Sequence, residues 1–266
     1  MLAFRILAVY LGVSLVAACV SPQVLPDPRA VSRLKGIHIV PMETHPLTID
    51  SSYIVTESAS DFDFQGQYIT DRARAVGVLS GIAVLIELSE LSRRPVEYTQ
   101  SFKKKIEPIE SWFPSVEIAQ EARNLLAASG RSPTISSEIK PIPGIQNRGR
   151  TVLMENWMAP IRAWYNDKLP CTQYVALTVK GIEAVVEIGI SNYEICAGKL
   201  LLQVHIKLID AASGQLLGRS RASSFTDLPP MRESFQGDAK LFKESVSQAG
   251  KQLLVRCLRE LGMLPK

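Results

Sequence analysis

The sequence predicts an α+β fold, with a small mixed or antiparallel sheet and helices packed on one face. Residues 183–191, 199–208 and 215–225 alternate apolar and polar side chains with the two-residue period of strands. Asp210–Gly214 supplies turn residues between the last two of these strands. Residues 238–262 then repeat apolar side chains at the spacing of an amphipathic helix that ends at Gly262. Strands with one covering helix give the α+β class.

The strand at 199–208 indicates which side chains should face the core. Its apolar residues occupy every second position, and Gln203, His205 and Lys207 stand between them. Such alternation is typical of a sheet with one buried face and one face in water. We therefore expect His205 at the surface. An earlier strand is expected at Gly36–Pro41, which also alternates.

Residues from about 70 to 168 predict a helical insertion within a single domain at 36–266. The segment Ala75–Ile86 carries no charged residue. Within it, Gly77 and Gly81 lie four residues apart, which gives a helix a small-residue face that another helix can approach closely. Three interpretations remain open for this segment: a buried core helix, a helix contact between subunits, or a segment that dips into a membrane.

Two further features are expected near the end of this insertion. Residues 130–150 contain three prolines and three glycines and predict a long loop. Residues 151–168 have a helical pattern, with Trp157, Ile161 and Trp164 on one apolar stripe.

The first eighteen residues have the layout of a secretory signal peptide. Arg5 supplies one positive charge, an uncharged run follows from Ile6 to Ala18, and small residues end it. The run has 13 residues before Cys19, whereas a membrane-spanning helix needs about 20. We therefore expect residues 1–18 to be removed.

The end of this run, Leu15–Cys19, resembles the lipobox of bacterial lipoproteins. The resemblance implies cleavage before Cys19 and attachment of three acyl chains, such as palmitate, to that residue, which would anchor the chain permanently. Val20 follows the cysteine in place of the aspartate that retains such proteins at the inner membrane. The resemblance therefore implies the periplasmic face of the outer membrane. The alternative is an ordinary signal peptide followed by a chance cysteine.

After cleavage, residues 19–35 are expected to form a tether, because Pro22, Pro26 and Pro28 disfavour helix and stiffen the chain. The formal net charge of +4 falls to +3 when Arg5 is lost. This charge is too small and too scattered to indicate nucleic-acid binding.

Three cysteines remain in the mature chain, in a compartment that permits disulfides. We expect a bond between Cys171 and Cys196, because a helix that runs into the strand at 183–191 would bring the two together. Cys171–Cys257 is the alternative. Cys257 fits the inward stripe of the last helix and is more simply a buried apolar residue.

No catalytic or cofactor motif occurs in the sequence. The nucleophile elbow Gly-x-Ser-x-Gly, the zinc motif His-Glu-x-x-His, the phosphate-binding loop and the dinucleotide motif are all absent. Ser191 lies in an apolar segment with no base nearby in sequence. The histidines and cysteines lack the spacing of a metal site. We therefore expect no metal, no cofactor and no enzymatic activity.

The second half resembles a family of periplasmic modules. The family includes the curli-secretion channel lipoprotein, the amino-terminal domain of TolB and a lipoprotein activator of penicillin-binding proteins. The matching segments are Gly181–Gly189 and Leu208–Gly218, followed by the final helix. Residues 57–170 have no counterpart in these modules, and such a likeness implies a fold without carrying a function.

These observations leave three functions open. The first is a non-catalytic, lipid-anchored envelope protein that docks a protein partner in assembly or secretion. The second is a subunit of an oligomeric curli-type secretion channel, in which Ala75–Ile86 packs between copies. The third is a hydrolase of unfamiliar geometry.

Overall fold

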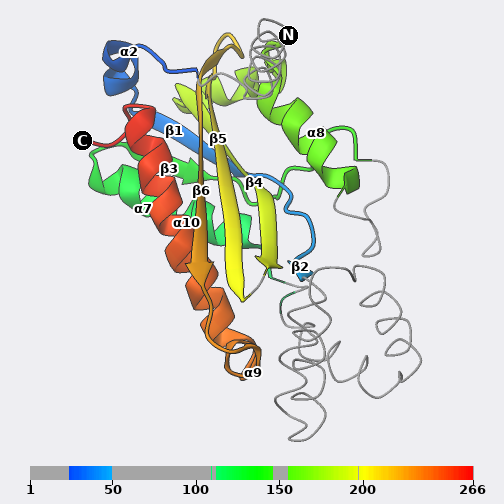
Figure 1. Cartoon of the computed structure of the whole chain (residues 1–266). Helices are drawn as coiled ribbons and strands as arrows, with labels where there is room; N and C mark the ends of the chain where they lie inside the picture. The colour runs from blue at the N-terminus through cyan, green and yellow to red at the C-terminus, as the bar shows by residue number, and fades with distance from the viewer. Residues whose placement is uncertain (1–23, 50–108, 110–111, 146–154, 197, 266) are drawn as a thin grey trace, which may run out of the picture.

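The computed structural model describes residues 24–49, 109, 112–145, 155–196 and 198–265. These residues form one mixed sheet with helices, which confirms the α+β class (Figure 1). The strands are β1 (Gly36–Pro41), β2 (Thr48–Ile49), β3 (Ser132–Ile135), β4 (Ala184–Cys196), β5 (Lys199–Asp210) and β6 (Leu216–Asp227). The helices are α2 (Pro28–Arg33), α7 (Pro114–Ala128), α8 (Glu155–Asn166), the 3₁₀ helix η1 (Thr172–Lys180), α9 (Met231–Ser234) and α10 (Lys240–Glu260).

The sheet joins a parallel part to an antiparallel part. Its main strand order is β3-β1-β4-β5-β6, and the short β2 also pairs with β4. Strand β1 runs parallel to both β3 and β4. Strands β4, β5 and β6 then form an antiparallel meander. The three strands predicted from alternation are these last three, and the sharp turn at Gly214, with φ of +70°, links β5 to β6.

The main core lies between the sheet and the two helices α7 and α10. It includes Val186 and Leu208, which pair across β4 and β5, and Phe242 and Leu254 from α10. The two helices approach each other at Gly250, where a Cβ atom would lie 2.7 Å from the Cδ1 atom of Ile118. The absence of a side chain at this position is therefore a condition of the helix contact.

A second core covers the opposite face of the sheet. Val185 and Ile209 contribute to it, although their chain neighbours belong to the main core. Helix α8 supplies the predicted stripe of Trp157, Ile161 and Trp164, all buried. Figure 1 shows α8 on the other side of the sheet from α7 and α10. Helices thus lie on both faces, and the expectation of one covered face is wrong.

The region predicted as a helical insertion contributes directly to the sheet. Helix α7 packs in the main core, and β3 forms an edge next to β1. Pro133 lies inside β3, in a segment predicted to be loop; an edge strand tolerates proline because one side of its backbone needs no partner. Residues 114–135 of the predicted insertion therefore contain a strand of the sheet besides a helix.

The segment predicted as a tether is docked on the domain from Val24 onward. The N–H group of Arg219 in β6 donates to the Val24 carbonyl oxygen, at 2.8 Å. Helix α2 follows, with Asp27 as its N-cap and Val31 fully buried in the main core. Pro28 starts this helix, a position where proline is compatible with helical geometry. The expectation that three prolines keep residues 19–35 extended is therefore wrong for α2.

Several predicted features lie outside the residues that the structure describes. These are Cys19, the Ala75–Ile86 segment and the Gly77 and Gly81 face, all of which stay predictions. Among the described residues, no helix is both long enough and apolar enough to span a membrane.

The packing of α8 on β4 leads to a first prediction. We expect Gly189→Ala to destabilise the domain by about 1–3 kcal/mol. The added Cβ atom would lie 2.7 Å from the Cη2 and Cζ3 atoms of Trp164. That ring is buried and donates a hydrogen bond to Glu187, so it cannot turn aside without losing this bond. Urea denaturation followed by fluorescence measures the free energy of unfolding.

The matched control introduces the same change into a Trp164→Phe background. Phenylalanine lacks the outer ring atoms that the new methyl group would meet, so the cost of Gly189→Ala should fall there. An unchanged cost in this background would show that the Gly189–Trp164 contact does not set it.

Candidate functional site

The side of the sheet that α8 covers carries polar residues opposite one another. We call this side the polar face. Its cross-strand rows are Glu187–Lys207–Arg219, Gly189–His205–Arg221 and, beyond a bulge in β4, Gln203–Ser223. The expectation that Gln203, His205 and Lys207 face water is therefore wrong for His205 and Lys207, which are buried.

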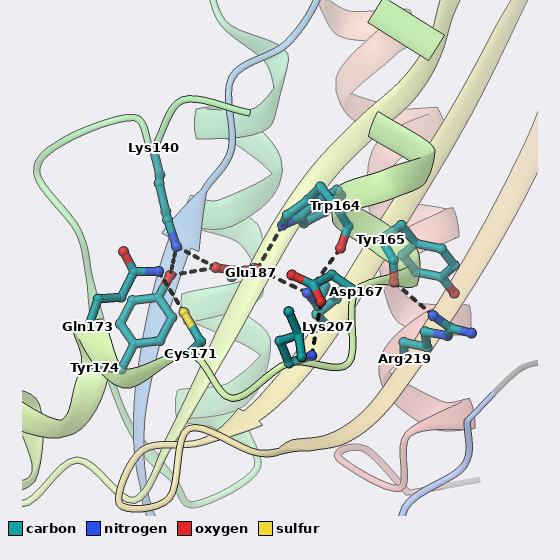
Figure 2. A network of polar contacts seen from close by, with 11 residues as sticks. Lys140, Trp164, Tyr165, Asp167, Cys171, Gln173, Tyr174, Glu187, Lys207 and Arg219 are labelled. Carbon is teal, nitrogen blue, oxygen red and sulfur yellow. Dashed lines mark hydrogen bonds and ion pairs between the residues drawn. The ribbon is translucent and has the colours of Figure 1, made fainter. Parts of the chain in front are cut away.

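The carboxylate of Glu187 is the centre of a buried hydrogen-bonded group, which we call the Glu187 cluster (Figure 2). Its Oε1 atom accepts from Lys140 Nζ at 2.7 Å and from Tyr174 Oη at 2.6 Å. Its Oε2 atom accepts from Trp164 Nε1 at 2.8 Å, and Lys207 Nζ lies 4.0 Å away. These partners come from four different elements of the chain, so one carboxylate joins segments that are distant in sequence.

The charges of the cluster stabilise one another. Burial by itself would raise the pKa of Glu187, but the charge of Lys140 and the hydrogen bonds from Lys140 and Tyr174 outweigh it and lower this pKa. Burial lowers the pKa of Lys207, and the nearby Glu187 partly offsets this effect. Burial and the Glu187 charge both raise the pKa of Tyr174. The carboxylate is therefore held ionised and fully hydrogen-bonded, which is the arrangement of a structural group.

Two buried cations of the polar face bind the carboxyl end of α8. Lys207 Nζ donates to the Trp164 carbonyl oxygen at 3.0 Å, and Arg219 Nη1 donates to that of Tyr165 at 2.9 Å. The last carbonyl groups of a helix have no partner within the helix and carry partial negative charge. Lys207 and Arg219 thus hold α8 on the sheet.

A second polar group lies one row further along. Ser191 Oγ is 2.6 Å from His205 Nε2 and donates to Gln203 Oε1 at 2.5 Å. His205 Nε2 is also 3.1 Å from Gln203 Oε1, and the His205 ring packs edge-on against Tyr165 at 4.4 Å between centroids. The expectation that Ser191 has no base nearby is wrong, because β5 brings His205 beside it.

This serine–histidine pair lacks the arrangement of a catalytic one. Two oxygen acceptors face His205 Nε2, which assigns the ring proton to that atom. Nε2 then donates to Ser191 and cannot take its proton. Burial and the charge of Arg221 lower the pKa of His205 to about 3. His205 Nδ1 is buried without a hydrogen-bond partner among the described residues, so no carboxylate orients the ring.

A pocket of about 570 Å³ opens beside this pair. Helix α8 contributes Arg162 and Tyr165 to its lining, and the polar face contributes Gln203, His205 and Arg221. Among the residues that the structure describes, no group of three or more histidines, cysteines, aspartates or glutamates could hold a metal ion.

The predicted Cys171–Cys196 disulfide is wrong, because both thiols are free in the structure. The N–H group of Cys171 donates to Gly214 in the β5–β6 turn, which adjoins the start of β4. Cys196 ends β4, about 40 Å further along at the usual rise per residue. Cys257 lies in the main core on the other face and is also free, as the buried-residue interpretation expected.

The buried polar residues of this face were missed because alternation in β5 suits two structures equally. A strand with one face in water and a strand with one polar but covered face both alternate with period two. The signal that could have separated them is the Trp157–Trp164 stripe of α8, since an apolar helix face needs a surface to cover.

The Glu187 cluster leads to a second prediction. We expect Glu187→Gln to lower the free energy of unfolding by about 3 kcal/mol, because it removes the carboxylate that pairs with Lys140 and lies 4.0 Å from Lys207. Glu194→Gln, on the same strand, is the matched control and should change stability by less than about 0.5 kcal/mol. Equal effects of the two substitutions in urea denaturation would contradict the role of the cluster.

The third prediction concerns acid stability. Unfolded histidine takes up a proton below about pH 6.5, whereas folded His205 does so only near pH 3. Stability should therefore fall as the pH drops from 6.5 towards 3, by up to about 1.4 kcal/mol per pH unit from this residue. Unfolding curves of the native chain and of His205→Gln, taken between pH 7 and 4, measure this contribution.

The variant should show a shallower pH dependence, although buried His45, whose pKa burial also lowers, keeps part of the slope in both proteins. Parallel stability profiles of the two proteins would mean that His205 is protonated in the folded state as readily as in the unfolded state.

Comparisons with known proteins give only distant similarity. No protein-family model and no curated protein matches the chain. Among solved structures, a single-substitution variant of the PelC dodecamer from Paraburkholderia phytofirmans is 10% identical, with a TM-score of 0.36, over 91% of this chain and 95% of that one. Lipoprotein GNA1162 from Neisseria meningitidis is 15% identical, with a TM-score of 0.25, over 51% and 83%. Similarity at this level assigns neither a family nor a function.

Proposed function

We propose that the chain is a non-catalytic envelope protein, anchored by acyl chains on Cys19 to the periplasmic face of the outer membrane, where it docks a protein partner. The observation that carries this proposal is the Leu15–Cys19 motif a few residues ahead of Val24, which pairs with the edge strand of the domain. Lipid attachment at Cys19 would make that domain a membrane-bound one.

Because Val24 pairs with β6, only the few residues between Cys19 and Val24 separate the lipid from the sheet. Between Cys19 and Val24 the chain spans at most about 18 Å when fully extended. The edge of the sheet at β6 and helix α2 would then lie close to the membrane surface. Arg29, Arg33 and Lys35 are exposed in this region and suit the anionic headgroups of a bilayer.

The geometry of the polar face supports a role without catalysis. Glu187 is saturated with donors, and Lys207 and Arg219 are used to hold α8. Within the described residues, Ser191 is the serine that has a histidine at hydrogen-bond distance, and its hydroxyl group donates to Gln203, which leaves its oxygen to accept from His205.

A surface for a protein partner is offered by η1. Its Val179 side chain is 91% exposed, and Val175 and the preceding Leu169 are also exposed. Two exposed aliphatic side chains on η1, with a third just before it, make this segment our candidate for a protein contact. A photo-crosslinking residue at Val179 should capture the partner in intact cells, whereas the same residue at Arg123, on α7, should not.

The fourth prediction tests the anchor. In cells fed an alkyne fatty acid, the native protein should be labelled and should fractionate with the outer membrane. Cys19→Ser should abolish both the labelling and the membrane association, and Cys257→Ser should leave both unchanged, because Cys257 is buried in the main core. Absence of label on the native protein would refute lipid attachment.

The size of the purified protein separates docking from the oligomeric alternative. A docking factor should elute in detergent near the mass of one mature chain with its bound detergent, and the mature chain is lighter than the 29.3 kDa of the full sequence. A subunit of a channel should elute at many times that mass, and that result would replace the docking proposal.

A further inference from the structure

The pocket at the end of the polar face combines positive charge with neutral hydrogen-bonding groups. Three arginines line it: Arg162 from α8, Arg221 from β6 and Arg256 from α10. No aspartate or glutamate is among the lining residues. Arg256 is paired with Glu260 at 3.3 Å. In the described part of the chain, Arg162 and Arg221 have no acidic partner.

The contrast with the neighbouring row shows that this charge is not needed for packing. Arg219 is 2% exposed and donates to the carboxyl end of α8. Arg221, two residues along the same strand, is only partly buried and lines the pocket instead. The pocket therefore carries positive charge from exposed Arg162 and half-buried Arg221 that no acidic side chain of the described residues neutralises, and an anionic ligand would pair with it.

The remaining lining indicates what the rest of such a ligand would be. Asn166, Asn192, Gln203 and Ser223 provide amide and hydroxyl groups that both donate and accept. Tyr165 provides an aromatic wall, fixed edge-on against His205. These amide and hydroxyl groups can form hydrogen bonds with a ligand that carries hydroxyl groups, whereas an apolar ligand would leave them without partners. The volume of about 570 Å³ is that of a small-molecule site.

We propose that this pocket binds a sugar-sized, hydroxylated organic anion, with its carboxylate or phosphate group held by Arg162 and Arg221. The guanidinium groups bind the oxygen atoms of the anion in a planar, forked geometry. The side chains of Asn166, Asn192, Gln203 and Ser223 bind the hydroxyl groups. This site goes beyond the proposed anchoring and docking role and does not depend on it.

Titration calorimetry on the full mature chain, in detergent and at low salt, tests the site with four probes. These are glucuronate, glucose 6-phosphate, neutral glucose and inorganic phosphate. Either or both of the anionic sugars should bind, and the tighter one identifies the charged group. Glucose and inorganic phosphate should each bind at least tenfold more weakly, because glucose lacks the anionic group and inorganic phosphate lacks the sugar hydroxyl groups.

Substitution of the arginines locates the binding. Arg221→Gln and Arg162→Gln should each weaken the binding of the anionic sugar at least tenfold and leave the melting temperature nearly unchanged, since neither side chain makes a hydrogen bond or ion pair within the described residues. Arg123→Gln, on the opposite face of the sheet, is the control and should bind like the native chain.

Three results would overturn the proposal. They are no binding of either anionic sugar, binding of neutral glucose as tight as that of the anionic sugars, and binding that survives both arginine substitutions. If inorganic phosphate binds as tightly as glucose 6-phosphate, the proposed contacts to the hydroxyl groups of the ligand are wrong.

Discussion

The structure depends on keeping the carboxylate of Glu187 ionised inside the protein. A buried charge costs several kcal/mol unless charged and hydrogen-bonding partners surround it. Here the partners come from the loop after β3, from α8, from η1 and from β5. Those segments are distant in sequence, and they also pack together through the apolar residues of the second core. The Glu187 carboxylate thus joins, by hydrogen bonds, segments that apolar packing also holds together.

The same layer uses the end of α8 as its other point of attachment. Lys207 and Arg219 would be expensive to bury alone, and the last carbonyl groups of a helix need donors. Their pairing satisfies both requirements. Gly189 completes the arrangement, because only the lack of a side chain there leaves room for the Trp164 ring. Charge pairing and close packing therefore position the same helix.

The sequence patterns predicted the strands and helices better than the contacts between them. The alternation in β4–β6, the stripe of α8 and the spacing in α10 all correspond to real elements, because local periodicity reports which side chains share a face. The patterns could not show what covers a polar face, so the prediction that His205 and Lys207 face water is wrong. Nor could they show that Pro133 belongs to an edge strand, or that Cys171 and Cys196 lie at opposite ends of β4. Those facts depend on contacts between distant segments.

At the pocket, the cations of the polar face are no longer bonded to other parts of the chain that the structure describes. Along β6, Arg219 is bonded to α8, and its backbone N–H group pairs with Val24. Two residues further on, Arg221 faces neither a helix end nor a carboxylate, and β4 offers Ser191 in place of an acid such as Glu187. The fold gives the buried cations of one row hydrogen-bond partners, whereas Arg221 on the next row and Arg162 from α8 line the open pocket. The difference between Arg219 and Arg221 on one strand is the physical reason why we propose a ligand site in the pocket and not at the buried cluster.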